Sequence, residues 1–200
     1  LYGRFAVTIK LNELNYLDTA KFYPDKTPYD KVAHYAVFGG SPFVNQALRP
    51  TATLRENIVS TILNPVSAVY LYASQLLLSD YSVKINAERI FAVIGNGKKR
   101  YSEIEDKLDV KKTGNLAKQM KPLRDLEIIS RNYPINKLND SKKSTFEIND
   151  NLLRFYFTFI YKNASALQVL GAEAFYDEYV APTLTDFISR RFGGICRDSF

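Results

Sequence analysis

From Asn86 to Asp150 the sequence changes to short, regularly punctuated units, and few small folds fit that pattern. Three amphipathic helices are expected in succession, each opened by a polar capping residue, and the first of them closed by a Gly-Asn-Gly turn. Two extended segments follow, joined by a polar stretch rich in Lys, Asn and Asp. Helix, short capped helix, third helix and hairpin is the order of a winged helix-turn-helix. The order therefore predicts that fold for this segment.

The caps and the apolar faces of these helices are predicted from residue spacing. The second helix is expected to begin at Ser102, with Glu105 three positions later completing a capping box. The third is expected to begin at Thr113, and Pro122 inside it removes an amide donor and favours a kink. Inward-facing residues predicted for the first helix are Ile90, Phe91 and Ile94, and those predicted for the third are Leu116, Met120, Leu123 and Leu126.

The same segment holds the whole charge imbalance of the chain. Between Lys98 and Lys143 there are 13 Lys/Arg and 7 Asp/Glu, whereas the rest of the chain has 14 of each. A positive excess confined to one compact segment is a local field, and such fields attract polyanions. In this fold the third helix lies in the major groove and the wing touches the backbone. Double-stranded DNA is therefore a candidate partner.

Candidate DNA contacts lie on the third helix and on the hairpin. Lysines on the helix suit phosphates, whereas Asn115 and Gln119 can form paired hydrogen bonds with adenine edges. An alternative stays open, because lysine is normal on any solvent-facing helix and a winged helix can serve only as a protein-binding or spacer module. The predicted DNA-binding set is Lys111, Lys112, Thr113, Asn115, Lys118, Gln119, Arg131, Lys137, Lys142 and Lys143.

Helices are predicted on both sides of this segment, so the chain is expected to be mainly α, with α+β character from the hairpin. After a strand-like start, one helix is expected to begin at Asp30 and to end at Gly39–Gly40, and another to begin at Thr53. The last 50 residues are expected to be helical and are rich in aromatic side chains. Three regions are therefore expected, over residues 1–85, 86–150 and 151–200.

Several catalytic and metal-binding classes are excluded by residue counts. A single Cys (Cys196) and a single His (His34) rule out an internal disulfide and a Cys/His-rich zinc site. The sequence also has no phosphate-loop motif and no G-x-G-x-x-G motif. No targeting segment or bilayer-length apolar run is present. These residues alone make no enzyme and no metal site, and a location in the cytoplasm, without membrane contact, is expected.

Short motifs along the chain follow a recognisable order. Leu1–Tyr2–Gly3–Arg4 resembles a strand end that follows a nucleotide-binding core, and Tyr35 with Gly39–Gly40–Ser41–Pro42 is similar to a "Y...GG.P" motif. Ser102–Glu103–Ile104, Leu152–Tyr156 and Phe192–Arg197 resemble later motifs of the same series. In this order the chain resembles the C-terminal half of prokaryotic, archaeal-type P-loop ATPases, which are STAND-like and AAA-related.

The resemblance implies a helical lid over 1–85, a winged helix over 86–150 and the start of a C-terminal domain over 151–200. It further implies a nucleotide core upstream of Leu1, so that ATP and Mg would be cofactors of the full-length ATPase and this part would hold none. Arg4, Gly39, Gly40 and Pro42 are carried over as candidates to lie near the nucleotide, since an arginine can stabilise charge on a phosphoryl group.

Two functional hypotheses follow for this part of the chain. In the first, it is the regulatory, DNA-binding winged-helix region of a cytoplasmic ATPase. In the second, the winged helix packs on the ATPase core of the same protein, or on another protein, and transmits nucleotide state without DNA contact. A stand-alone transcriptional regulator is a third alternative. Whether the face of the third helix is open or covered distinguishes the first two.

Overall fold

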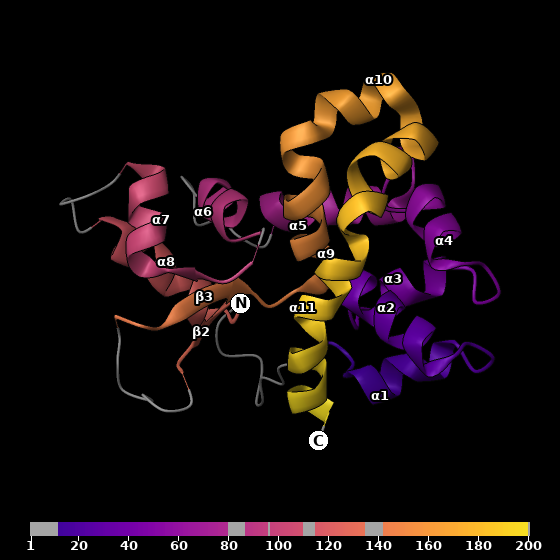
Figure 1. Cartoon of the computed structure of the whole chain (residues 1–200), viewed down its shortest axis with the longest axis horizontal. Helices are drawn as coiled ribbons and strands as arrows, with labels where there is room; N and C mark the ends of the chain where they lie inside the picture. Colours follow the sequence, from indigo (N-terminus) through magenta and orange to yellow (C-terminus); the bar gives the residue numbers. More distant parts are fainter. Residues whose placement is uncertain (1–11, 80–86, 96, 110–114, 135–141, 200) are drawn as a thin grey trace, which may run out of the picture.

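The computed structural model describes residues 12–79, 87–95, 97–109, 115–134 and 142–199. These residues form a mainly helical α+β structure with one small antiparallel sheet, which confirms the predicted fold class (Figure 1). Two hydrophobic cores divide it. We call the part made of α1–α5 and α10–α11 the helical body, and the part made of α6–α8 and the three strands the sheet module. The predicted N-terminal strand lies outside the described residues.

The N-terminal half of the helical body consists of short helices with well-defined starts. Thr27 caps α2, its hydroxyl accepting the Asp30 amide proton at 3.2 Å, and Pro28 occupies the first turn. This helix therefore begins earlier than Asp30, where the sequence predicted it. The start predicted at Thr53 is confirmed, because Thr53 and Glu56 form a reciprocal capping box. The elements are α1 (Tyr16–Thr19), η1 (Ala20–Phe22), α2 (Pro28–Phe38), α3 (Pro42–Ala47), α4 (Leu54–Ser60) and α5 (Ala68–Ser79).

The C-terminal part of the chain packs back onto these helices. It consists of α10 (Ala164–Phe175), the π-helical turn η4 (Tyr176–Val180) and α11 (Ala181–Ser199), and α11 lies against α1 and α2. Arg55 on α4 adds surface ion pairs to Glu173 and Asp177, at 2.6 and 3.1 Å. Most buried apolar side chains of residues 151–200 therefore belong to the same core as those of residues 23–73.

The sheet module begins with α6 (Ala87–Ile94) and contains the three helices and the two hairpin strands in the order predicted from the sequence, together with a short strand, β1, that was not predicted. Ile90, Phe91 and Ile94 are buried, as predicted. β3 lies at the centre of the sheet and pairs antiparallel with both neighbours. The other elements are β1 (Lys99–Arg100), α7 (Tyr101–Leu108), α8 (Asn115–Asp125), β2 (Ile129–Asn132) and β3 (Thr145–Ile148).

Two predicted details of α7 and α8 are wrong. α7 begins at Tyr101 and not at Ser102. Its capping box uses Glu103, whose carboxylate accepts the Arg100 amide proton at 2.6 Å, and not Glu105. Leu126 does not extend the buried stripe of α8 but is 52% exposed. The helix has ended at Asp125, and Glu127 at φ 59° turns the chain into β2. Pro122 lies inside α8, as predicted.

One helical segment contributes to both cores. It runs through α9 (Asn151–Phe155), the π-helical turn η2 (Tyr156–Ile160) and the 3₁₀ turn η3 (Tyr161–Asn163). Phe155 is buried in the core of the body, whereas Phe157 is buried in the core of the module. The two parts therefore share a helix. No described helix combines the length and the apolarity needed to cross a lipid bilayer.

Candidate nucleic-acid interface

The α8 helix has one buried and one exposed face. Leu116, Met120 and Leu123 are buried in the module core, at spacings of four and three residues. The opposite face is open: Ala117, Lys118, Lys121 and Arg124 are all exposed, so no described segment of the chain covers them. This is the geometry that a helix needs to enter a groove of a larger partner.

Arg131 is fixed at the base of the β2–β3 hairpin. Its guanidinium carbon lies 5.6 Å from the ring centroid of Phe146 and 5.0 Å from that of Tyr133, and its Nε donates to the Ser144 hydroxyl at 2.8 Å. Two aromatic rings and a hydrogen bond limit the orientations of this side chain. The Arg131 guanidinium is therefore held in a defined position.

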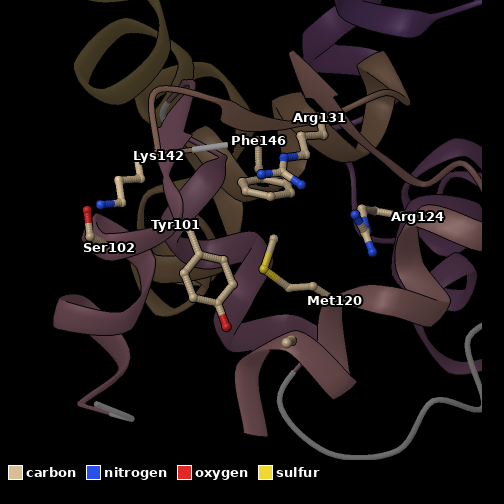
Figure 2. Close-up of a pocket in the computed structure, with 8 residues that line it drawn as sticks. Tyr101, Ser102, Met120, Arg124, Arg131, Lys142 and Phe146 are labelled. Carbon is tan, nitrogen blue, oxygen red and sulfur yellow. The ribbon is translucent and has the colours of Figure 1, made fainter. Parts of the chain in front are cut away.

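A pocket of about 520 Å³ lies between the start of α7, α8 and the hairpin (Figure 2). Lys142 and Ser102 line one side, Arg124 the other, and Arg131 lies over the ring of Phe146 between them. The side chains that line it include three cations and no carboxylate. Its lining residues are Tyr101, Ser102, Ala117, Met120, Arg124, Arg131, Lys142 and Phe146.

The nearest described acidic side chains of α8 and β3 point to other cations. Asp125 pairs with Lys121 at 2.6 Å, one turn along α8. Glu147 is almost buried and faces Lys98 at 3.5 Å and Arg154 at 3.1 Å. These two carboxylates do not line the pocket, although burial, together with the nearby Glu105 carboxylate, raises the pKa of the Tyr101 phenol. The lining itself carries the positive side chains of Arg124, Arg131 and Lys142.

Of the predicted DNA-binding set, the structure brings Arg131 and Lys142 together in one pocket. Lys118 and Lys143 are exposed, Gln119 and Arg131 are half-buried, and Lys142 reaches the pocket. Asn115 is the first residue of α8. Lys111, Lys112, Thr113 and Lys137 lie outside the described residues.

Sequence reasoning overlooked Lys121 and Arg124. From Ala117 they follow at spacings of four and three residues, which places them on one helical stripe with it. That periodicity is visible in the sequence, whereas the predicted DNA-binding residues of this helix end at Gln119.

The second predicted site, near Gly39, Gly40 and Pro42, is a tightly packed turn. Gly40 accepts the Leu14 amide proton at 3.1 Å and donates its own to the Glu13 carboxylate at 3.3 Å. A Cβ at Gly40 would lie 1.8 Å from the Leu14 carbonyl oxygen, so only glycine allows this approach. Pro42 opens α3 and is exposed. Arg4 lies outside the described residues.

The surroundings of this turn are acidic. Glu13 lies at the protein surface, but the protein atoms around its carboxyl group and the nearby Asp150 carboxylate raise its pKa to about 7. Burial likewise raises the pKa of Asp150. The Gly40 amide proton already has a carboxylate partner, and a phosphate placed there would meet like charge.

His34 and Cys196 show no catalytic arrangement. His34 is buried, its Nδ1 lies 2.7 Å from the Asp30 carbonyl oxygen, and burial lowers its pKa. Cys196 is a half-buried free thiol. Among the described residues no group of three or more His, Cys, Asp or Glu side chains is arranged to hold a metal ion.

Comparison with known proteins gives one distant relative. A protein of Methanocaldococcus jannaschii, described only as uncharacterized, is 25% identical over 169 residues, which are 84% of this chain and 38% of that protein. The chain thus spans little more than a third of its relative's length. No protein-family model and no solved structure matches the chain.

Proposed function

We propose that residues 87–148 are a winged helix-turn-helix that binds double-stranded DNA through the open face of α8 and the β2–β3 hairpin. The observation that carries this proposal is the exposed stripe of α8 beside a pocket lined by three cations and no carboxylate. The order α6, β1, α7, α8, β2, β3 and the central position of β3 support it.

The described side chains suit contacts to the sugar-phosphate backbone better than they suit base recognition. Lys118 and Lys143 are exposed, and lysine binds phosphate as a mobile point charge. Arg131 is pre-oriented by its aromatic neighbours, so little freedom is lost when it binds a phosphate. Gln119 remains the described candidate for reading a base edge. We therefore expect strong salt dependence and modest sequence preference.

We place this module in a cytoplasmic P-loop ATPase whose nucleotide core, with ATP and Mg, lies outside the chain. The order of motifs from Leu1 to Arg197 supports that setting. DNA binding would then be a regulatory input to the ATPase.

A second candidate function is an intramolecular switch without DNA contact. The helical segment shared by both cores favours it, because a displacement of α9 and η2 would move the module relative to the body. The face of α8 that such a switch would use against an ATPase core is the same open face. The two functions therefore differ in what binds that face: duplex DNA in the first and the ATPase core in the second.

A duplex-binding measurement on charge-matched variants separates the two functions. The double variant Lys118→Ala/Lys143→Ala removes two exposed cations of the proposed interface, and Lys162→Ala/Arg197→Ala removes two exposed cations outside it, one in η3 and one in α11. By fluorescence anisotropy with a labelled 20-base-pair duplex in 50 mM salt, the first double variant should bind roughly ten-fold more weakly than the unchanged chain. The second should bind within about two-fold. Equal weakening by both, or no binding by the unchanged chain, would overturn the DNA-binding proposal.

A further inference from the structure

A second pocket lies where the sheet module meets the helical body. Its volume is about 530 Å³, within the range of sites for small organic ligands. One wall comes from Gly97 and Lys98, which directly precede β1, and from Lys99 at the start of that strand. The opposite wall comes from α11, with Thr183 and Arg190. A ligand bound there would contact both parts of the molecule.

The inner wall of this junction pocket is built from buried, hydrogen-bonded groups. Arg154 is 8% exposed and donates to the Glu147 carboxylate at 3.1 Å and to the Ile148 carbonyl oxygen. Thr158 belongs to the π-helical turn η2, and its hydroxyl donates to the Gly95 carbonyl oxygen at 2.8 Å. π-Helical turns are rare and are frequent at functional sites. Burial lowers the pKa of Arg154 to about 10, well above physiological pH, so the guanidinium stays charged.

The chemistry of the lining favours an anion with an apolar body. Four of the lining side chains are cationic (Lys98, Lys99, Arg154 and Arg190) and two are acidic (Glu147 and Asp186). Phe159 and Phe187, which are 4% and 8% exposed and have ring centroids 5.4 Å apart, form the aromatic part of the lining. Threonine hydroxyls on two walls add hydrogen-bonding groups. An aromatic surface beside a cationic rim matches a flat ring that carries a phosphate.

We propose that the junction pocket binds a small phosphorylated ligand with a flat aromatic body, of the size of a mononucleotide. The ligand would place its ring against Phe159 and Phe187 and its phosphate towards Lys99 and Arg190. Because its walls belong to the module and to the body, binding would fix their relative position. The site does not include the open face of α8, so it stands or falls independently of DNA binding.

The test is calorimetric titration of the 200-residue chain with AMP, GMP, CMP and UMP, with the four corresponding nucleosides, and with ribose 5-phosphate and inorganic phosphate. At least one mononucleotide should bind with a Kd on the order of tens of micromolar. The corresponding nucleoside and the two phosphates without a base should bind at least ten-fold more weakly. If no mononucleotide shows saturable binding at concentrations up to 1 mM, roughly a hundred-fold above the lower end of the expected Kd, the proposal is wrong. If inorganic phosphate binds as tightly, the aromatic part of the site is wrong.

Variants locate the binding in this pocket. Thr183→Trp fills it from α11, whereas Thr185→Trp adds the same side chain at an exposed position of α11 outside the lining. Lys99→Glu reverses a charge of the rim, and its control is Lys162→Glu at an exposed site. Thr183→Trp and Lys99→Glu should each weaken mononucleotide binding at least ten-fold, and both controls, together with Lys118→Ala, should leave it within two-fold. Unchanged binding by Thr183→Trp would place the ligand elsewhere and overturn the proposal.

Discussion

The helical body and the sheet module use their charged side chains in different ways. In the body, Arg55 joins α4 to the Glu173 and Asp177 carboxylates, so a surface cation links distant parts of the chain. In the module, Arg124, Arg131 and Lys142 surround a pocket that no carboxylate lines. In the body, the described cation of α4 connects distant helices, whereas these three cations of the module lie around one pocket. We therefore propose the module, and not the body, as the part that contacts an anionic partner.

The two parts also differ in their cores, although they share one helix. Phe155 is buried with the helices of the body, whereas Phe157, two residues on, packs against Phe91 of the module at a ring-centroid distance of 5.2 Å. The body has the larger core, built mainly from helices. The core of the module combines three helix faces with one face of the sheet. Because the two cores share a helix, it can be tested whether the body and the module unfold separately or as one unit.

The largest expected effect comes from truncating these two aromatic side chains separately. Phe155→Ala and Phe157→Ala should each cost about 3–5 kcal/mol in the free energy of unfolding, because each removes a fully buried ring. Hydrogen exchange should speed up mainly in residues 28–63 for Phe155→Ala and mainly in residues 87–108 for Phe157→Ala. Equal acceleration of both regions by both variants would show that body and module unfold as one unit.

A smaller effect is expected where α6 meets the shared helix. At Gly95 a Cβ would lie 2.8 Å from the Phe157 Cβ, so Gly95→Ala must push the two elements apart and should destabilise the chain by about 1–3 kcal/mol. Gly193→Ala is the matched control in α11, where a Cβ would meet nothing within 4 Å and alanine favours a helix. Chemical denaturation should show a loss of stability for the first variant and none for the second. A neutral Gly95→Ala would mean that this contact does not hold the parts together.

The smallest effect concerns the acidic turn of the body. In the folded chain the pKa of Glu13 is raised to about 7, from an ordinary value of 4.5, so the folded state binds the proton more tightly than the unfolded state. Stability linked to this group is present below pH 4.5 and is lost as the pH rises through 7. Glu13→Gln keeps an acceptor for the Gly40 amide and removes the charge.

This substitution should raise Tm by about 2–4 °C at pH 8, a value kept small because the side chain is accessible to solvent. At pH 5 it should leave Tm nearly unchanged. Glu178→Gln, at an exposed carboxylate of η4, is the control. A Tm difference that is the same at pH 5 and pH 8 would contradict the raised pKa.

Local signals in the sequence predicted local structure well. The helix start at Thr53 and the buried stripe of Ile90, Phe91 and Ile94 follow from a capping residue and from spacings of three and four residues, which a sequence displays directly. The capping box predicted from Ser102 and Glu105 is wrong, because the structure uses Glu103. The end of α8 did not follow from spacing. Leu126 continues the apolar period, but the backbone of Glu127 turns into the left-handed region and brings Ile128 into the core.

Long-range packing could not be read from the sequence. Phe155 and Phe157 enter different cores because of the π-helical turn η2 and the close approach of α6 to it. Neither feature produces a periodic pattern in the sequence. The close contact of Gly40 with Leu14 likewise joins residues 26 positions apart. For the candidate interface, the sequence identified the helix and the hairpin. The convergence of Arg124, Arg131 and Lys142 on one pocket required the fold.

The most direct test of the central claim is the salt dependence of duplex binding by the intact chain. If Lys118, Arg131, Lys142 and Lys143 each neutralise a phosphate, the plot of log K against log salt concentration should have a slope of about −3.6. The double variant Lys118→Ala/Lys143→Ala should reduce the steepness by about 2. A slope near zero, or a slope that the double variant leaves unchanged, would contradict the account of the sheet module as a cationic surface for DNA.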